Sequence, residues 1–269
     1  IIIDEAHIQE FNYLFEDGIL DDKLVLGFTA TPSRSGKMRQ LGLDYEVLIR
    51  GAEPKDLIKL GYLLNCDLYE ADSPDMTGVK INATNNDYNE QSMFERFDKP
   101  TLYKGLLSNY REKANGKRMI VFCCNIEHAI KTTVELRNAG YRAKFVTSEV
   151  SKPISKNSMT EAELAIYNEK LRRYNFFLKY YTDYSGPRKQ IIEEFKRGDF
   201  EIIVNVDMLT KGFDDPSVEV VAIYRATTSM TLWLQMLGRG SRIFEQIGKT
   251  HFTAFDFGGN AKRLGNYDS

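Results

Sequence analysis

Two adjacent carboxylates follow an apolar run at the start of the chain. Asp4 and Glu5 come directly after three isoleucines and precede Ala6 and His7. A parallel strand that ends in such a pair places both carboxylates at the sheet edge where ligands bind. One carboxylate can hold Mg²⁺, directly or through water, and its neighbour can orient and deprotonate an attacking water. A strand leaving the core explains a bare Asp-Glu pair more simply, but the tetrapeptide after three isoleucines favours the ligand site.

Small hydroxyl residues end the second apolar run. Residues 24–30 read LVLGFTA, contain Thr29 and lead into Thr31 and Pro32. Such hydroxyls can hydrogen-bond a neighbouring strand end and relay its state. Taken alone, these residues are explained better by a strand followed by a turn.

A third cluster follows the buried run near residue 204. Residues 202–219 read IIVNVDMLTKGFDDPSVE and include Thr210, Gly212 and Asp214. Glycine lets a backbone approach a ligand closely. The acid can accept a hydrogen bond from a ribose hydroxyl or from a partner arginine.

A fourth cluster contains two arginines. Residues 235–242 read QMLGRGSR, so Gln235, Arg239 and Arg242 recur at i, i+4 and i+7. This spacing predicts one face of a helix. Two such arginines are ordinarily a solvated charge pair, but a planar guanidinium fork also matches a phosphate.

The elements that position these clusters alternate between strand and helix. Continuous apolar runs predict strands buried on both faces of a parallel sheet. The strands are expected at 1–4, 24–30, 66–71, 118–123, 143–147, 201–206, 218–224 and 251–257. Helical patterns that begin at Pro or Asn and stop at Gly cover 54–61, 125–140 and 187–198. The predicted class is α/β, with a doubly wound parallel sheet flanked by helices.

Residues 158–185 break this alternation. Thr160 and Glu163 form a capping box, and leucines and tyrosines recur every seven residues from 164 to 181. They predict an a/d seam over three heptads. Such a helix is about 36 Å long at 1.5 Å per residue, so we expect an inserted helical arm.

Three roles are open for this arm. Over residues 151–190, eight basic and four acidic side chains give +4, and seven aromatic residues lie in the same stretch. The seam can pack onto its own domain, or it can bind a protein partner or a second copy as a short coiled coil. The basic and aromatic side chains can instead contact nucleic acid.

The four clusters together resemble a known family. DEAH (4–7), TATP (29–32), VNVDMLTKGFDDP (204–216) and QMLGRGSR (235–242) occur in the order of motifs II, III, V and VI of the superfamily 2 DEAD/DEAH-box helicases and translocases. RMIVFCCNIEHA (118–129) resembles motif IV. The tail FDFGGNAKRLG (255–265) is similar to the DNA helicase branch that includes restriction-enzyme motor subunits, which favours DNA as the nucleic acid.

The resemblance implies two RecA-like domains. Residues 1–52 would be the C-terminal part of the first, ATP-binding domain. Residues 53–269 would be the second, helicase C-terminal domain, with the arm 158–185 inserted. The implied activity is ATP-dependent helicase or translocase movement on nucleic acid. The alternative is a non-catalytic nucleic-acid-binding or scaffold module derived from a helicase.

The resemblance also implies roles in the use of ATP. Asp4 would help hold Mg²⁺, Glu5 would be the catalytic base beside it, and Arg239 and Arg242 would act across the cleft as arginine fingers. Contacts to nucleotide or strand are implied for two further residues, Gly212 and Asp214.

Coupling roles are implied for a second set of residues. His7 and Gln235 would couple ATP to the opposite domain. Thr29, Thr31 and Thr210 would link hydrolysis to the movement of nucleic acid.

One part of the family pattern is missing from the chain. No GxxxxGK[ST] phosphate loop occurs; GKT at 248–250 has Ile243 where the first glycine belongs, and SGK at 35–37 is followed by Met38. We therefore expect the chain to be a fragment of a longer protein that does not hydrolyse ATP by itself.

Composition excludes several other classes. The 269 residues carry 36 basic and 38 acidic side chains, a net charge of −2, which permits a local basic channel. The three cysteines form no CxxC pair, so a disulfide framework or zinc site is not expected. No apolar run approaches the roughly 20 residues that span a bilayer, and we expect a cytoplasmic protein without a membrane partner.

Overall fold

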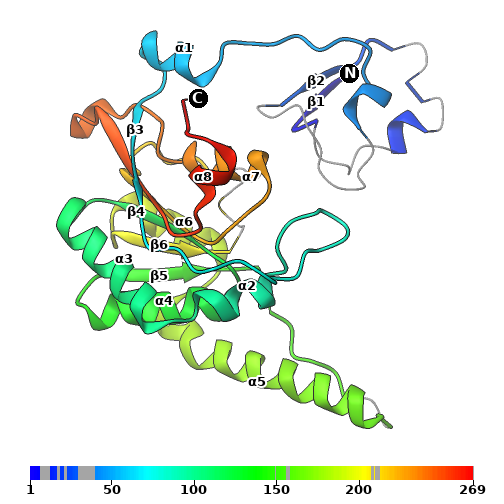
Figure 1. Ribbon diagram of the computed structural model, residues 1–269, viewed down its shortest axis with the longest axis vertical. Coiled ribbons are helices and arrows are strands. Elements are labelled where there is room, and N and C mark those ends of the chain that lie inside the picture. Colours follow the sequence, from blue (N-terminus) through cyan, green and yellow to red (C-terminus); the bar gives the residue numbers. More distant parts are fainter. Residues whose placement is uncertain are drawn as a thin grey trace.

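Two separate parallel sheets form the framework of the chain (Figure 1). The computed structural model describes residues 1–6, 13–16, 19–20, 23–29, 40–148, 150–155, 158–206, 209 and 213–268. Strands β1 (Ile2–Asp4) and β2 (Leu26–Phe28) make a two-stranded sheet. An extended segment connects this sheet to the larger unit, and it leads into α1 (Pro54–Lys59).

The larger sheet has six strands in the order β3-β8-β7-β4-β6-β5, and all neighbouring strands are parallel. Their bounds are β3 (Asn65–Glu70), β4 (Met119–Cys123), β5 (Ala143–Val146), β6 (Ile202–Asn205), β7 (Val220–Tyr224) and β8 (His251–Asp256). Every residue of β4, β6 and β7 is buried. The continuous apolar runs therefore predicted the centre of a parallel sheet correctly.

Helices cover both faces of this sheet. One face packs against α2 (Glu90–Phe97), α3 (Pro100–Lys113), α4 (Ile126–Asn138) and α5 (Glu161–Tyr184). The other face packs against α1, α6 (Arg188–Arg197), α7 (Met230–Leu237) and α8 (Asn260–Leu264). Short 3₁₀ turns occur at Leu41–Leu43 and Glu245–Ile247. The three layers confirm the predicted α/β class.

The small sheet differs from the expectation of burial on both faces. Ile3 is buried, but Ile2 is 71% exposed and Leu24, just before β2, is 78% exposed. A sheet of only two strands cannot cover its own two faces. The apolar run here therefore indicates a surface that a further layer of protein would cover.

The helices α2 and α3 were missing from the sequence-based expectation. Their buried side chains follow helical spacing, as Met93 and Phe97 do on α2 and Leu102, Leu106 and Tyr110 do on α3. Pro100 begins α3 at its first turn, which is a favourable position for proline. The helical spacing of apolar residues is present in the sequence, but it was not recognised because it follows a long polar loop.

The arm is confirmed as a single helix, α5. Its capping box is present, because Glu163 N donates to Thr160 Oγ1 and Thr160 N donates to Glu163 Oε2. The predicted heptad seam is wrong at its C-terminal end, where Phe177 is buried at 6% exposure and Leu178 is 46% exposed. A straight helix repeats every 3.6 residues, so its buried face drifts away from a strict seven-residue pattern.

The two halves of the arm have different surroundings. Phe177 and its neighbours Phe176, Tyr180, Tyr181 and Tyr184 pack against the core of the large domain. In contrast, Leu164 and Ile166 in the first half are exposed. Figure 1 shows this half projecting beyond the rest of the molecule. Packing on its own domain therefore accounts for the second half of the arm only.

Candidate functional site

The carboxylate pair lies at the carboxyl end of β1, as predicted. Asp4 ends the strand opposite Phe28, and Ala6 N donates to Phe28 O at 3.0 Å, which fixes the turn after the strand. Glu5 N donates to Asp4 Oδ1 at 2.9 Å. Glu5 has φ 51°, a left-handed conformation that is uncommon outside glycine and concentrates at functional sites. The two carboxylates thus leave the strand in a constrained turn.

The arginines lie after α7, and the prediction that they share a helical face with Gln235 is wrong. The helix begins at the cap Ser229 and ends at Leu237, so Gln235 is helical but Arg239 and Arg242 are not. Residues 238–242 form a tight turn, here called the arginine turn, in which Gly240 N donates to Leu237 O at 3.0 Å.

Gly240 lets the arginine turn lie close to the large sheet. A Cβ at Gly240 would lie 2.3 Å from the ring of Phe252 on β8, closer than any real contact. The turn is therefore pressed against the sheet, and only glycine fits there.

The arginine turn contacts residues 213–217, here called the acidic loop. Arg239 Nη1 donates to the carbonyl of Phe213, a residue that is buried in the core. Arg242 Nη1 lies 2.9 Å from Asp214 Oδ2, and both of these side chains are about half exposed. The structure therefore brings together Asp214, Arg239 and Arg242, and the roles that the resemblance implies for them stay predictions.

The acidic loop is held from its other side by Arg118. Arg118 Nη2 lies 3.1 Å from Asp215 Oδ2, and both side chains are largely buried. Ser217 N and Ser217 Oγ both donate to Asp215 Oδ1, at 3.0 Å and 2.6 Å. Asp215 thus fixes the loop and leaves the neighbouring Asp214 at the surface.

The electrostatics connect the two sheets. Burial lowers the pKa of the Arg239 guanidinium, and the charge of Arg242 lowers it further. The charges of Asp214 and Glu5 act in the opposite direction. Glu5, which follows β1, is therefore close enough for its charge to act on Arg239, which follows α7. A carboxylate on one side and guanidinium groups on the other are a combination that can receive a phosphate and an attacking water.

The arginine cluster lies at the edge where strands of the large sheet begin. The acidic loop precedes β7, and the segment after the arginine turn leads into β8. Leu64, directly before β3, donates its N–H to Ser241 O at 2.8 Å. The rule that ligands bind at carboxyl ends of strands thus locates Asp4 and Glu5 but not the arginines.

Several predicted residues lie outside the part of the chain that the structure describes. They are His7, Thr31, Thr210 and Gly212. Thr29 follows β2 directly and Gln235 lies on α7, both partly buried. Their coupling roles stay predictions.

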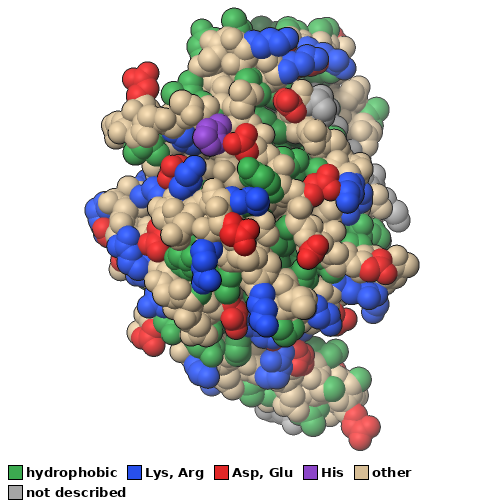
Figure 2. Space-filling view, turned by 60° about the vertical axis from the view of Figure 1, so that its left-hand side comes forward, with side chains coloured by type: hydrophobic (Ala, Val, Ile, Leu, Met, Phe, Trp, Pro, Cys, Tyr) green, Lys and Arg blue, Asp and Glu red, His purple; other side chains and the backbone are tan. Residues whose placement is uncertain are grey.

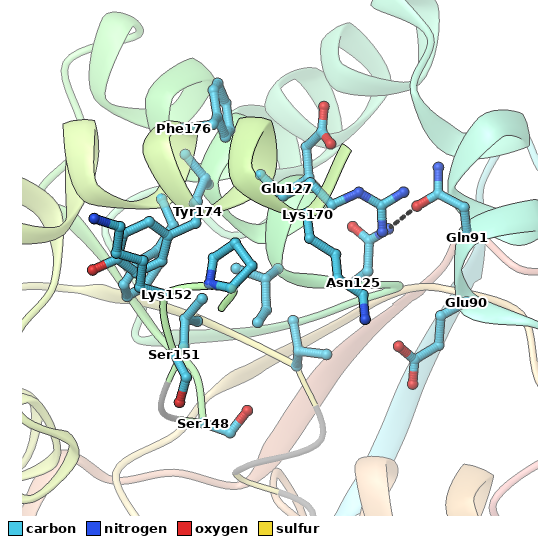
Figure 3. A pocket seen from close by; sticks show the side chains of 17 residues that line it. Glu90, Gln91, Asn125, Glu127, Ser148, Ser151, Lys152, Lys170, Tyr174 and Phe176 are labelled. Atoms are coloured by element: carbon cyan, nitrogen blue, oxygen red, sulfur yellow. Dashed lines mark hydrogen bonds between the residues drawn. The ribbon is translucent and has the colours of Figure 1, made fainter. Parts of the chain in front are cut away.

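A groove of about 630 Å³ lies at the opposite edge of the large sheet (Figure 3). Asn125, Ser148 and Val206, which follow β4, β5 and β6, contribute to its wall. The arm forms the other side through residues that include Lys170, Tyr174 and Phe176. Asn125 also caps α4, because His128 N donates to its Oδ1 at 2.8 Å.

The charges around the groove are partly compensated. Glu127 pairs with Arg172 at 3.1 Å and with Lys131 at 3.3 Å. Arg173 pairs with Glu169 at 2.8 Å. Lys152 and Lys170 also line the groove, and both are exposed. Elsewhere, Figure 2 shows basic and acidic side chains interspersed over the visible face.

The described residues contain no group of three or more His, Cys, Asp or Glu side chains arranged to hold a metal ion. Within the same residues, no helix is both long enough and apolar enough to cross a bilayer.

Sequence reasoning missed two features of these sites. The groove draws on segments between residues 90 and 206 that share no motif. The anchoring pair Arg118 and Asp215 is 97 residues apart in sequence. Neither feature has a local signal, because each exists only after the strands have paired.

Comparisons with known sequences find similar proteins among the helicases. The family described as helicase conserved C-terminal domain matches residues 154–244. A 51.5 kDa protein of Lactococcus phage (isolate 7-9) is 28% identical over 246 residues, which cover 90% of this chain and 46% of the relative. A Saccharomyces cerevisiae protein assigned as the ATP-dependent helicase IRC3 is 24% identical over 96% of this chain and 33% of its own length.

A third relative is a restriction-enzyme subunit. The type I restriction enzyme EcoKI endonuclease subunit of Escherichia coli is 27% identical over 150 residues, which cover 56% of this chain and 11% of that subunit. The chain thus spans half or less of the length of these relatives.

A solved structure shares the fold. A fragment assigned as the HsdR subunit of a type I restriction enzyme from Vibrio vulnificus YJ016 superposes with a TM-score of 0.66 at 22% identity. The match covers 100% of this chain and 45% of that one. The six-stranded sheet is therefore RecA-like. Residues 154–244 thus match the helicase conserved C-terminal domain family, and the chain is similar to ATP-dependent helicases and to type I restriction enzyme subunits.

Proposed function

We propose that the chain forms part of an ATP-dependent helicase or translocase that couples ATP hydrolysis to movement along nucleic acid. The observation that carries the proposal is the pair of motif-borne clusters that the structure forms, the Asp4–Glu5 turn at the carboxyl end of β1 and the Asp214–Arg239–Arg242 cluster of the larger unit. In such a cleft Glu5 takes a proton from the attacking water. Arg239 and Arg242 stabilise the negative charge that develops on the transferred phosphoryl group.

In the proposed cleft, Asp4 would hold Mg²⁺ directly or through water. The two carboxylates at the end of β1 are oxygen ligands of the kind that Mg²⁺ prefers, and the ion usually keeps several waters and phosphate oxygens. When bound, the ion would neutralise phosphate charge. Asp214 and Arg242 would complete the rim of the cleft from the second domain.

The division at residues 52 and 53 is also part of the proposal. An apolar surface on the described part of residues 1–52 supports it, because such a surface usually contacts further protein. Its exposed members are Ile1, Ile2, Tyr13, Ile19, Leu24, Leu26, Phe28, Leu43, Val47, Leu48 and Ile49. We infer that the rest of the ATP-binding domain covers this surface in the whole protein and supplies the loop that cradles the phosphates.

The proposed nucleic-acid path crosses the groove beside the arm. Exposed Lys152 and Lys170 can neutralise phosphates, and the aromatic ring of Tyr174 can stack with a base. The arm would then serve as one wall of the path, with its second half anchored on the domain through Phe177. DNA is the favoured nucleic acid, because the tail at 255–265 resembles DNA helicases.

Loss of Lys152 and Lys170 is expected to weaken binding of single-stranded DNA to the chain. Each lost phosphate contact should reduce the slope of log affinity against log salt by about 0.7. Fluorescence anisotropy with a labelled oligonucleotide at several salt concentrations measures this for the Lys152→Ala/Lys170→Ala variant. The control is Lys189→Ala, an exposed residue on α6 at the opposite face of the sheet. An unchanged slope would remove the groove from the path, and RNA of the same sequence tests the preference for DNA.

ATP turnover tests the proposed function itself. The whole protein is expected to hydrolyse ATP faster when nucleic acid is added, whereas the 269-residue chain alone is expected to show no measurable turnover, because it has no GxxxxGK[ST] loop. A coupled phosphate-release assay measures both. Robust turnover by the chain alone would contradict the assignment of the missing loop. Nucleic-acid binding by the whole protein without any turnover would favour the alternative, a non-catalytic binding or scaffold module.

A further inference from the structure

Lys249 lies under the arginine turn, in the segment that leads into β8. Only 8% of the residue is exposed. Its ammonium donates three hydrogen bonds to backbone carbonyls, at 2.7 Å to Gly240, 3.0 Å to Arg242 and 3.1 Å to Pro216. An ammonium has three donors and no acceptor, so these carbonyls use its full capacity.

The three carbonyls belong to two different segments. Gly240 and Arg242 are in the arginine turn, whereas Pro216 is in the acidic loop. Lys249 comes from neither segment, yet it binds the backbone of both. Buried carbonyls need a donor, and here one charged group serves three of them.

The charged form of Lys249 is the one that can make all three bonds. Burial lowers the pKa of this ammonium to about 8, and the charges of Glu219 and Asp215 raise it. A group with this pKa is mostly protonated at neutral pH. A buried charge is costly unless it is fully hydrogen-bonded, which is the situation here.

We propose that Lys249 is a positioning residue that fixes the arginine turn to the acidic loop, so that Arg239 and Arg242 are held in place beside Phe213 and Asp214. The two segments then move as one unit when the cleft opens or closes. What the arginines do there rests on the proposed function, but the link between the segments is a property of this chain. The sequence GKT at 248–250 lacks the pattern of a phosphate loop, and its lysine, Lys249, instead links two segments of the chain.

Amide hydrogen exchange of the 269-residue chain tests this link. Lys249→Met keeps the length of the side chain but removes its donors. Lys249→Arg keeps the charge, but a planar fork cannot direct three donors at three converging carbonyls. We expect exchange in residues 213–217 and 238–242 to be at least tenfold faster in the Met variant and intermediate in the Arg variant. Exchange in β4 and β6 should not change.

The matched control is Lys262→Met, which removes an exposed lysine that pairs with Glu70 at 3.0 Å. It should leave exchange in both segments as in wild type. Wild-type exchange in Lys249→Met, or equal acceleration in β4 and β6, would overturn the proposal. If the Met variant does not fold, wild-type exchange in Lys249→Arg would overturn it equally.

A kinetic readout connects the link to the cleft. In the whole protein, Lys249→Arg should lower kcat for ATP hydrolysis at least tenfold and change KM for ATP less than twofold, because it displaces groups that act in the transition state. If the whole protein has no ATPase, the proposed function fails, but the exchange experiment still decides the role of Lys249.

Discussion

Replacing Arg239 with alanine is expected to lower ATP turnover by the whole protein by about 10³-fold or more, the range found for arginine fingers in phosphoryl transfer. The guanidinium is partly buried, donates to the Phe213 carbonyl and lies within reach of the Glu5 charge. Its loss would remove one of the two cations proposed to stabilise the developing phosphate charge. Steady-state hydrolysis with saturating nucleic acid measures the effect.

Two further variants sharpen this prediction. Arg242→Ala removes a half-exposed arginine that pairs with Asp214. This variant should lose less ATP turnover than Arg239→Ala does. Arg197→Ala removes an exposed arginine on α6 that pairs with Asp199, and it should hydrolyse ATP as wild type does. Melting curves of all three variants separate loss of catalysis from loss of structure. Turnover by Arg239→Ala within threefold of wild type would rule out the finger role.

Replacing Glu5 with glutamine is expected to give the second large effect. The amide keeps the shape of the side chain but cannot take a proton from water, so turnover should fall by about 10²- to 10⁴-fold. Binding of ATP should be retained, because Glu5 acts on the water rather than on the nucleotide. A fluorescent nucleotide measures binding in the same preparation that is assayed for turnover.

The control for this substitution is Glu46→Gln, which alters an exposed glutamate in the same N-terminal part of the chain. It should match wild type in both binding and turnover. Wild-type turnover by Glu5→Gln would show that the base lies elsewhere. Loss of nucleotide binding would instead assign Glu5 to holding the metal and phosphates.

The sequence predicted the features that depend on neighbouring residues. The cap at Asn125, the capping box of Thr160 with Glu163 and the stop at Gly198 are all present, because each needs only a few adjacent residues. The six strands of the large sheet are also as predicted, since continuous burial leaves a clear apolar pattern.

The features that were missed depend on contacts between distant residues. The spacing of Arg239 and Arg242 fits a helix, but the ring of Phe252 allows only glycine at 240 and the helix ends before it. On the arm, Phe177 rather than Leu178 lies on the buried face. The reason is similar, because contact with the domain decides which side of the helix is buried, and a heptad repeat does not. Lys249 carried no recognisable motif, and its three carbonyl partners become visible only in the folded chain.

The sequence therefore proposes the candidate site as a set of residues but not as a geometry. The motifs single out Asp4, Glu5, Asp214, Arg239 and Arg242 as candidates. They did not reveal that the arginines lie where the strands of the large sheet begin, while the groove lies where three of its strands end. With this arrangement, nucleotide and nucleic acid would meet opposite edges of one domain, and a rigid sheet would connect them.

The central claim is that Glu5 and Arg239 act on the two sides of one bound phosphate. A crystal structure of the whole protein with ADP, Mg²⁺ and aluminium fluoride tests it directly, because the fluoride occupies the place of the transferred phosphoryl group. We expect the Glu5 carboxylate within about 3 Å of the attacking water and the Arg239 guanidinium within about 3 Å of the fluoride. A fluoride bound with Arg239 turned away from it, or on the far side of the domain from Glu5, would contradict the claim.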